Sequence, residues 1–230
     1  MRILLTKAKN NLEILENNFV KNGHTIFCLP VLNALEVKSV AFDFSDYQNV
    51  IFTSSHSIQF LKNKKNIEHL KCYCVGQATA KAAKNFGFKN IVSCGGNYTS
   101  LKNTFFNLEN QKSVKTIYIR GEFISNDLVK EFKQEGYFVN EIINYTTELN
   151  HSFEDEIKTI LLNQSIDIIF LYSKRASDFL LKIILNHQLA SACEKIKLRT
   201  LSENVFFPLK KIKWENIKIF EPGHEEFCLD

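Results

Sequence analysis

The sequence predicts an α/β fold of two similar lobes, each an open parallel sheet flanked by helices. Two observations support this prediction. Short apolar segments alternate with amphipathic helical segments along the chain, and pieces of the first half recur in the same order in the second half. The recurring pieces are Leu15, Phe19 and Gly23 as Leu128, Phe132 and Gly136, Thr53-Ser54 as Tyr172-Ser173, and Asn90-Ile91 as Asn216-Ile217. A tandem duplication with small insertions accounts for this order.

The first half begins with a buried strand at residues 2–6, and an amphipathic helix follows that stops at Gly23. A second strand over residues 24–32, ended by Pro30, closes a βαβ unit. The right-handed crossover rule makes its two strands parallel. The other elements expected in this half are strands 49–53, 72–75 and 90–93 and helices 54–62 and 77–86, the last ending at Gly87.

The second half repeats this alternation of strands and helices. Pro208 lies inside what the repeat would make a helix, so that helix is expected to be short, kinked or shifted. The strands expected here are 116–120, 137–145, 166–172, 196–201 and 216–220, and the helices are 126–135, 152–163 and 174–187.

Two divisions of the chain into domains fit this pattern. The segments after the first βαβ of each copy are long and extended, which suits crossing linkers. In that case residues 1–33 and 150–230 form one discontinuous α/β domain and residues 37–143 form the other, with linkers at about 34–36 and 144–149. A sequential division near residue 113 is the alternative.

Composition excludes several classes of protein. The chain has 230 residues, of which 45% are hydrophobic and 23% charged, and this composition is ordinary for a globular protein. Its net charge of +4 is well below the clustered excess typical of nucleic-acid-binding chains. The apolar run after Met1 is too short for a signal peptide or a membrane anchor, so a cytoplasmic protein is expected. No nucleic-acid or membrane partner is expected.

The six cysteines are expected to be reduced, buried thiols, because the chain shows no secretory signal. Cys72 and Cys74 would share one face of a strand, and His224 and Cys228 would lie one helical turn apart. Neither pair has a second pair at zinc-site spacing, so no metal site is expected.

Five blocks of residues, in order and with compatible spacing, resemble the uroporphyrinogen-III synthase family over nearly the whole chain. They are Ile3-Leu4-Leu5-Thr6-Lys7, Val50-Ile51-Phe52-Thr53-Ser54, Val75-Gly76-Gln77-Ala78-Thr79-Ala80, Ile119-Arg120-Gly121 and Asn144-Tyr145-Thr146-Thr147. The resemblance implies two α/β domains joined by a two-stranded linker. It also implies closure of hydroxymethylbilane, a linear tetrapyrrole polycarboxylate, to uroporphyrinogen III with inversion of the last pyrrole ring. No metal, nucleotide or organic cofactor is implied, and a monomer is expected.

Candidate substrate-binding residues lie where strands are expected to meet helices. Helix N-termini at the carboxyl ends of parallel strands present unpaired N–H groups, which suit carboxylates. Ordinary helix capping is the alternative role of each hydroxyl. The candidates are Ser54, His56, Gln77, Thr79, Ser173, Ser202, Lys7, Lys174, Arg120 and Arg175.

The resemblance alone selects Tyr145, which matches the linker tyrosine that the family is thought to use to position or protonate the leaving hydroxyl. A phenol with a pKa near 10 stays protonated at pH 7 and suits a donor.

The sequence departs from the family pattern at two places. Residues 201–206 lack the glycine and threonines usual there, and Lys7 replaces an arginine.

Two other functions fit the residues. A non-catalytic, two-lobed binder of a small anionic ligand is the main alternative. A nucleotide-dependent transferase is the other, but the chain has neither a G-x-G-x-x-G motif nor a P-loop.

Overall fold

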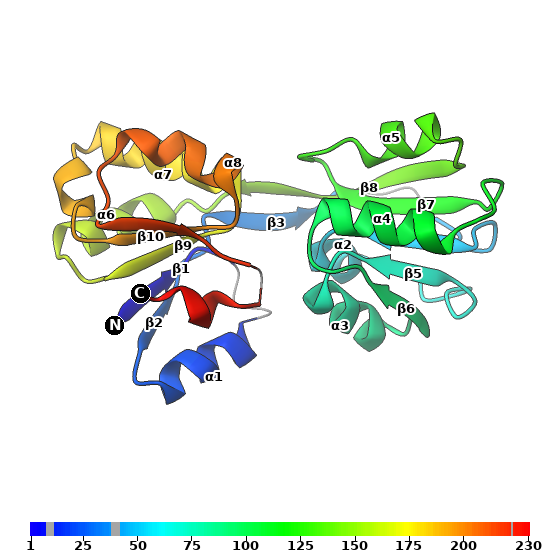
Figure 1. Ribbon diagram of the computed structural model, residues 1–230, viewed down its shortest axis with the longest axis horizontal. Helices are drawn as coiled ribbons and strands as arrows, with labels where there is room; N and C mark the ends of the chain where they lie inside the picture. Colours follow the sequence, from blue (N-terminus) through cyan, green and yellow to red (C-terminus); the bar gives the residue numbers. More distant parts are fainter. Residues whose placement is uncertain (8–11, 38–41, 222) are drawn as a thin grey trace. The chain divides into compact units, whose positions relative to one another are not determined.

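The computed structural model describes residues 1–7, 12–37, 42–221 and 223–230. Contacts between Cα atoms divide the chain into two compact units. Unit 1 comprises Met1–Asn33 and Glu148–Asp230, and unit 2 comprises Ala34–Thr147. The α/β fold class predicted from the sequence is confirmed, because each unit is built on a sheet of mainly parallel strands flanked by helices (Figure 1).

Unit 1 contains a sheet whose described strands have the order β11-β10-β9-β1-β2. All four pairings are parallel, and β1 lies between β2 and β9. β1 therefore pairs with β9, a strand from the second half of the sequence. The strands are β1 (Arg2–Leu5), β2 (Thr25–Cys28), β9 (Ile168–Leu171), β10 (Lys197–Thr200) and β11 (Asn216–Ile219).

Helices cover both faces of this sheet. The helices α6 and α7 cover one face, and α1 covers the other together with the C-terminal segment (Figure 1). Alternate residues of each strand point to opposite faces, so Leu4 contributes to one core and Ile3 and Leu5 to the other. The helices are α1 (Glu13–Lys21), α6 (Phe153–Leu162), α7 (Lys174–Asn186) and α8 (Glu203–Phe206), with 3₁₀ turns η2 (Ala190–Cys193), η3 (Phe207–Lys211) and η4 (Glu225–Cys228).

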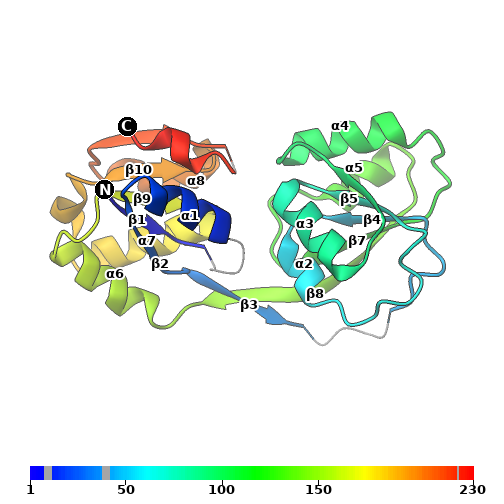
Figure 2. The ribbon, with the colours of Figure 1, turned by 90° about the horizontal axis from the view of Figure 1, so that it is seen from below.

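Unit 2 contains a sheet whose described strands have the order β3-β8-β7-β4-β5-β6. The pairings from β8 to β6 are parallel. Figure 2 shows α4 and α5 on one side of this sheet and α2 and α3 on the other. The elements are β3 (Leu32–Glu36), β4 (Asn49–Phe52), α2 (Ser55–Gln59), β5 (Lys71–Cys74), α3 (Gln77–Phe86), β6 (Asn90–Ser93), α4 (Tyr98–Leu108), β7 (Thr116–Gly121), α5 (Leu128–Gln134) and β8 (Val139–Leu149).

β3 and β8 carry the chain from one unit to the other. The backbone N–H of Val37 donates to the carbonyl of Asn144, and the N–H of Asn150 donates to the carbonyl of Val31. Val31 thus lies opposite Asn150 and Val37 lies opposite Asn144, so the two strands run antiparallel. The single strand predicted over residues 24–32 is wrong, because β2 ends at Cys28 and β3 begins only at Leu32. Pro30 lies between them and has no N–H for a sheet.

The region around Pro208 is a short helix, α8, that passes into the 3₁₀ turn η3. The expectation of a short or shifted helix is confirmed. Proline fits here because it occupies the first turn of η3, where its missing N–H is not needed. Four cysteines are buried thiols, as expected, namely Cys72, Cys74, Cys94 and Cys193, whereas Cys28 and Cys228 are half-buried.

Candidate active site

The candidate site in unit 2 lies where β4, β5 and β7 end. These strands are parallel, so their carboxyl ends meet at one edge of the sheet. Ser54 follows β4 and is the N-cap of α2, where its Oγ accepts a hydrogen bond from the N–H of His56 at 3.2 Å. A serine Oγ that accepts in this way can still donate its own proton to a ligand. Capping and ligand binding are therefore compatible at Ser54.

The residues predicted after β5 differ in exposure. Gly76 is the N-cap of α3, and Gln77, the first residue of the helix, is exposed. Thr79 is only 5% exposed and belongs to the buried side of α3. Gln77 and the N-terminal N–H groups of α3 are thus open to a ligand, whereas the Thr79 side chain contributes mainly to packing.

Tyr145 lies on β8 next to the end of β7, where it pairs with Gly121. Its ring stacks with Phe60, with ring centroids 6.2 Å apart, and lies 5.6 Å from the ring of His56. Burial raises the pKa of Tyr145, and the side chain of Ser54 acts in the opposite direction. The phenol is therefore protonated throughout the physiological range.

His56 is half-buried at the start of α2, and its Nδ1 lies 3.4 Å from Oγ of Ser54. Burial lowers the pKa of His56 below its usual 6.5. The ring is accordingly neutral at pH 7, and it is a hydrogen-bonding group rather than a source of positive charge. Ser54, His56 and Tyr145, all chosen from the sequence, lie together in unit 2.

This burial has a measurable consequence for pH dependence. Between the folded pKa of His56 and the unfolded value of 6.5, the unfolded chain binds a proton that the folded protein does not bind. We therefore expect the free energy of unfolding to decrease as the pH falls from 7 through 6.5, and His56→Gln to lose that part of the decrease. Urea titrations of both proteins at several pH values measure how the free energy of unfolding depends on pH. Equal pH slopes for the two proteins would contradict the expectation.

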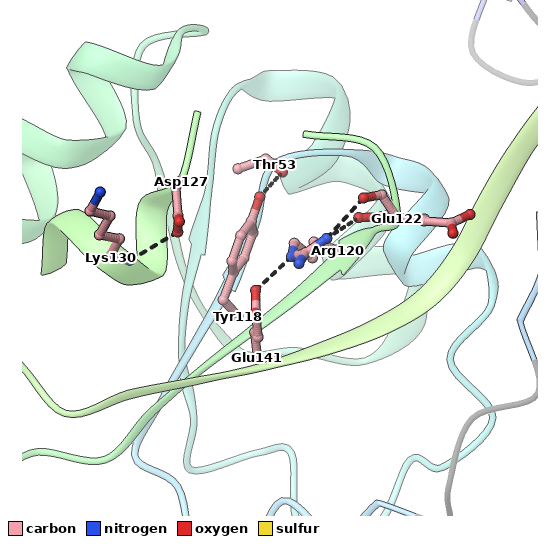
Figure 3. Close-up of polar contacts among 8 residues, drawn as sticks. Thr53, Tyr118, Arg120, Glu122, Asp127, Lys130 and Glu141 are labelled. Atoms are coloured by element: carbon pink, nitrogen blue, oxygen red, sulfur yellow. Dashed lines mark hydrogen bonds and ion pairs between the residues drawn. The ribbon is translucent and has the colours of Figure 1, made fainter. Parts of the chain in front are cut away.

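Figure 3 shows a second group of polar side chains in unit 2, which comes from β7, from β8 and from the residue after β4. Thr53 and Tyr118 share a hydrogen bond of 2.9 Å between their hydroxyls. Arg120, only 8% exposed, donates from Nε to Glu141 at 2.6 Å and from Nη1 to the carbonyls of Gly121 and Glu122. These contacts fix the shape of the β7 end. Because the Arg120 guanidinium is already paired with Glu141, Arg120 is a weak candidate for substrate binding.

Unit 1 has equivalent positions after β9 and β10. Ser173 caps α7 and accepts from the N–H of Ala176 at 3.2 Å, and Ser202 caps α8 and accepts from Val205 at 3.4 Å. Lys174 is exposed and pairs with Asp178 on the next helical turn at 2.8 Å. Exposed pairs of this kind contribute about 0 to 1 kcal/mol, so an anionic ligand can compete for Lys174.

Lys7 is held by groups that sequence reasoning missed. Its Nζ lies 3.3 Å from Oε1 of Glu225 and 4.4 Å from the ring centre of Tyr172. Glu225 is fully buried, and its other oxygen accepts from the N–H of Gly223 at 2.8 Å. No sequence pattern pairs residues this far apart. Phe60, in contrast, was predictable, since it follows His56 by one helical turn.

The two units give one type of site twice, namely capping hydroxyls and helix N-termini at the carboxyl ends of parallel strands. In unit 2 a buried tyrosine lies beside it. This fold and these sites define a two-unit α/β protein with hydrogen-bond donors at the carboxyl ends of its strands. No helix within the described ranges is long and apolar enough to cross a membrane. In the part of the chain that the structure describes, no group of three or more His, Cys, Asp or Glu is placed to hold a metal ion.

Comparison with known proteins gives the family. The family described as Uroporphyrinogen-III synthase HemD matches residues 14–221. The chain belongs to the uroporphyrinogen-III synthase family, which comprises cyclising lyases of porphyrin and heme biosynthesis. This membership does not favour the alternative of a non-catalytic anion binder. Among curated proteins, none matches the sequence significantly.

Solved structures of the same family share the fold. The uroporphyrinogen-III synthetase of Helicobacter pylori 26695 is 16% identical, with a TM-score of 0.63 over 100% of this chain and 99% of that one. A mutant uroporphyrinogen III synthase from the extremely thermophilic bacterium Thermus thermophilus is 13% identical, with a TM-score of 0.52 over 95% of this chain and 92% of that one. At these identities the likeness concerns the fold.

Proposed function

We propose that this protein closes hydroxymethylbilane to uroporphyrinogen III, with inversion of the last pyrrole ring and loss of water, and that Tyr145 donates the proton to the departing hydroxyl. Family membership supports the reaction. The observation that supports the role of Tyr145 is its position, half-buried beside the end of β7 and protonated because burial raises its pKa.

The proton balance of the reaction suits a phenol. As the carbon–oxygen bond breaks, its electron pair leaves with the oxygen, and a proton from Tyr145 completes a water molecule. An already substituted carbon of the last pyrrole ring attacks the azafulvenium that remains and forms a spiro intermediate. The older bond from that carbon to its methylene bridge then breaks and gives a second azafulvenium, which the unsubstituted α-carbon of the inverted ring attacks. Ring closure finally releases one proton from a pyrrole carbon, and this proton restores the phenol. No net proton is consumed.

Ser54 and His56 would support this step. His56 is neutral, so its ring can hydrogen-bond without attracting a substrate carboxylate away from the helix N-termini. The Ser54 side chain interacts with Nδ1 of His56 and with the hydroxyl of Tyr145, and its own hydroxyl can donate to the phenolate that forms. Ser54 would thus stabilise the charge on the Tyr145 oxygen while the substrate is the azafulvenium.

The substrate carboxylates would be held by donors at the strand ends. In unit 2 these are Gln77, the N-terminal N–H groups of α3 and, while Tyr145 is still protonated, Ser54. In unit 1 they are Ser173, Ser202 and Lys174. Lys7 would have to exchange Glu225 for a substrate carboxylate, so we propose a smaller part for it.

The protein should convert hydroxymethylbilane mainly to the type III isomer without added metal or nucleotide. The measurement is incubation with enzymatically generated hydroxymethylbilane, followed by oxidation and separation of the type I and type III isomers. A reaction without the protein gives the spontaneous product. Type I product formed at the spontaneous rate and in the spontaneous proportion would refute the proposed function.

We also propose that the enzyme is a cytoplasmic monomer that acts on this small molecule alone. A mild net charge of +4 supports the absence of a nucleic-acid partner. Light scattering at the protein concentration of the assay tests the monomer, for which the expected mass is 26.6 kDa.

A further inference from the structure

The phenol of Tyr145 occupies space that a side chain at position 121 would fill. A Cβ built on Gly121 would lie 2.5 Å from Cζ of Tyr145 and 2.8 Å from both its Cε2 and its hydroxyl oxygen. Contacts under 3.0 Å essentially never occur for a real Cβ. Gly121 does not have a positive φ, so other residues could adopt its backbone conformation. The close approach of the ring is therefore what requires glycine at this position.

An irregularity in strand pairing brings the two residues together. Along β7 and β8, Arg120 pairs with Ile143 and the next residue, Gly121, pairs with Tyr145. Asn144 is skipped, which is the pattern of a β-bulge. Beyond the bulge, the N–H of Glu122 donates to the carbonyl of Tyr145 at 2.9 Å. The bulge thus shifts Tyr145 by one position and places it opposite the glycine.

The skipped residue is itself anchored. Asn144 is 4% exposed, and its Nδ2 donates to the carbonyl of Ser57 in α2 at 2.6 Å. The same helix carries His56, and Phe60 follows at its end; both rings contact Tyr145. One helix therefore holds the bulge through its backbone and the phenol through its side chains, while Gly121 leaves room for the ring.

We propose that Gly121 is a positioning residue for the reaction: its missing side chain defines the place of the Tyr145 hydroxyl, and the bulge at Asn144 sets the register that joins them. This inference rests on the proposed function, because it assumes that the hydroxyl acts on the substrate. Gly121 does not touch the reacting atoms. It acts through Tyr145.

The test is Gly121→Ala in three backgrounds, namely the parent protein, Tyr145→Phe and Tyr145→Ala. In the parent, the added methyl group must displace the ring, and a misplacement of about 1 Å can cost on the order of 10²-fold in rate. We expect kcat to fall by roughly that factor, KM to change much less, and the melting temperature to decrease.

The other two backgrounds separate positioning from packing. Tyr145→Phe keeps the ring without the hydroxyl. In this background Gly121→Ala should lower the melting temperature, as it does in the parent protein, and should leave the already reduced rate unchanged. Tyr145→Ala removes the ring, so Gly121→Ala should change neither quantity. If Gly121→Ala alone fails to fold, its combination with Tyr145→Ala should fold.

Three results would overturn the inference: an equal rate loss from Gly121→Ala in all backgrounds, a parental kcat in the single variant, or a double variant with Tyr145→Ala that fails to fold. A parent protein that makes no type III product would instead refute the proposed function. In that case the melting temperatures would still report the contact between Gly121 and Tyr145.

Discussion

Tyr145→Phe is expected to slow single-turnover conversion of hydroxymethylbilane by about 10²- to 10⁴-fold, the usual contribution of a general acid. The change removes the hydroxyl and keeps the ring, which contacts Phe60 and His56. The thermal melt should therefore stay close to that of the parent protein. Single-turnover rates and melts of the two proteins measure both quantities.

Tyr137→Phe is the matched control. It also removes a phenolic hydroxyl from unit 2, one that donates to the carbonyl of Glu109 at 2.9 Å. Loss of that hydrogen bond should cost about 1 kcal/mol of stability and leave the rate unchanged. A Tyr145→Phe protein with the parental rate would remove the tyrosine from the mechanism and leave positioning by backbone amides as the main source of catalysis.

Arg199→Ala is expected to destabilise unit 1 by about 3 to 5 kcal/mol, because Arg199 is a large polar side chain in β10 that is fully buried, with an exposed fraction of 0%. Its Nη1 donates to Oδ1 of Asn216 at 2.7 Å, and its Nη2 donates to the carbonyl of Asp230 at 2.6 Å. Nε donates to the carbonyl of Cys228. Alanine would leave these acceptors unpaired and a cavity beside them.

Urea denaturation followed by fluorescence measures this effect. The single tryptophan, Trp214, is 7% exposed and packs in a core of the same unit, so it reports on unit 1. Lys213→Ala is the control, since Lys213 is an exposed cation paired with Glu194 at 2.9 Å. It should cost less than about 1 kcal/mol. Similar losses for the two variants would show that the buried contacts of Arg199 contribute little.

Much of the fold could be predicted because inner strands such as β4, β7 and β9 are short and buried along their whole length. β4, with the sequence NVIF, is buried along its whole length and is bounded by polar residues. α4 was missed, although it had two signals. Asn97 is its N-cap, and Leu101 and Phe105 are buried one turn apart. The β-branched and aromatic residues of this segment obscured the helical period.

The site was less predictable, because its contacts join residues far apart in the chain. Ser54, His56 and Gln77 follow strands and could be chosen by position alone. Tyr145 could be chosen only by resemblance, since a half-buried tyrosine in a strand is usually a packing residue. The tight approach of Gly121 and the ion pair between Lys7 and Glu225 depend on strand register and on the C-terminal segment, which local patterns do not encode.

The position of β1 between β2 and β9 determines the order in which a nascent chain can fold. Residues 34–147 contain all the strands of unit 2 except the ends of β3 and β8, so that unit can form while synthesis continues. Ile3, Leu4 and Leu5, fully buried in the finished protein, must meanwhile wait for Ile168–Leu171. β9 follows β1 by 165 residues, since Ile3 pairs with Ile168, so at about 5 to 20 residues per second its synthesis takes roughly 8 to 33 seconds longer. During that interval the three apolar side chains lack one of the two strands that flank them in the folded protein.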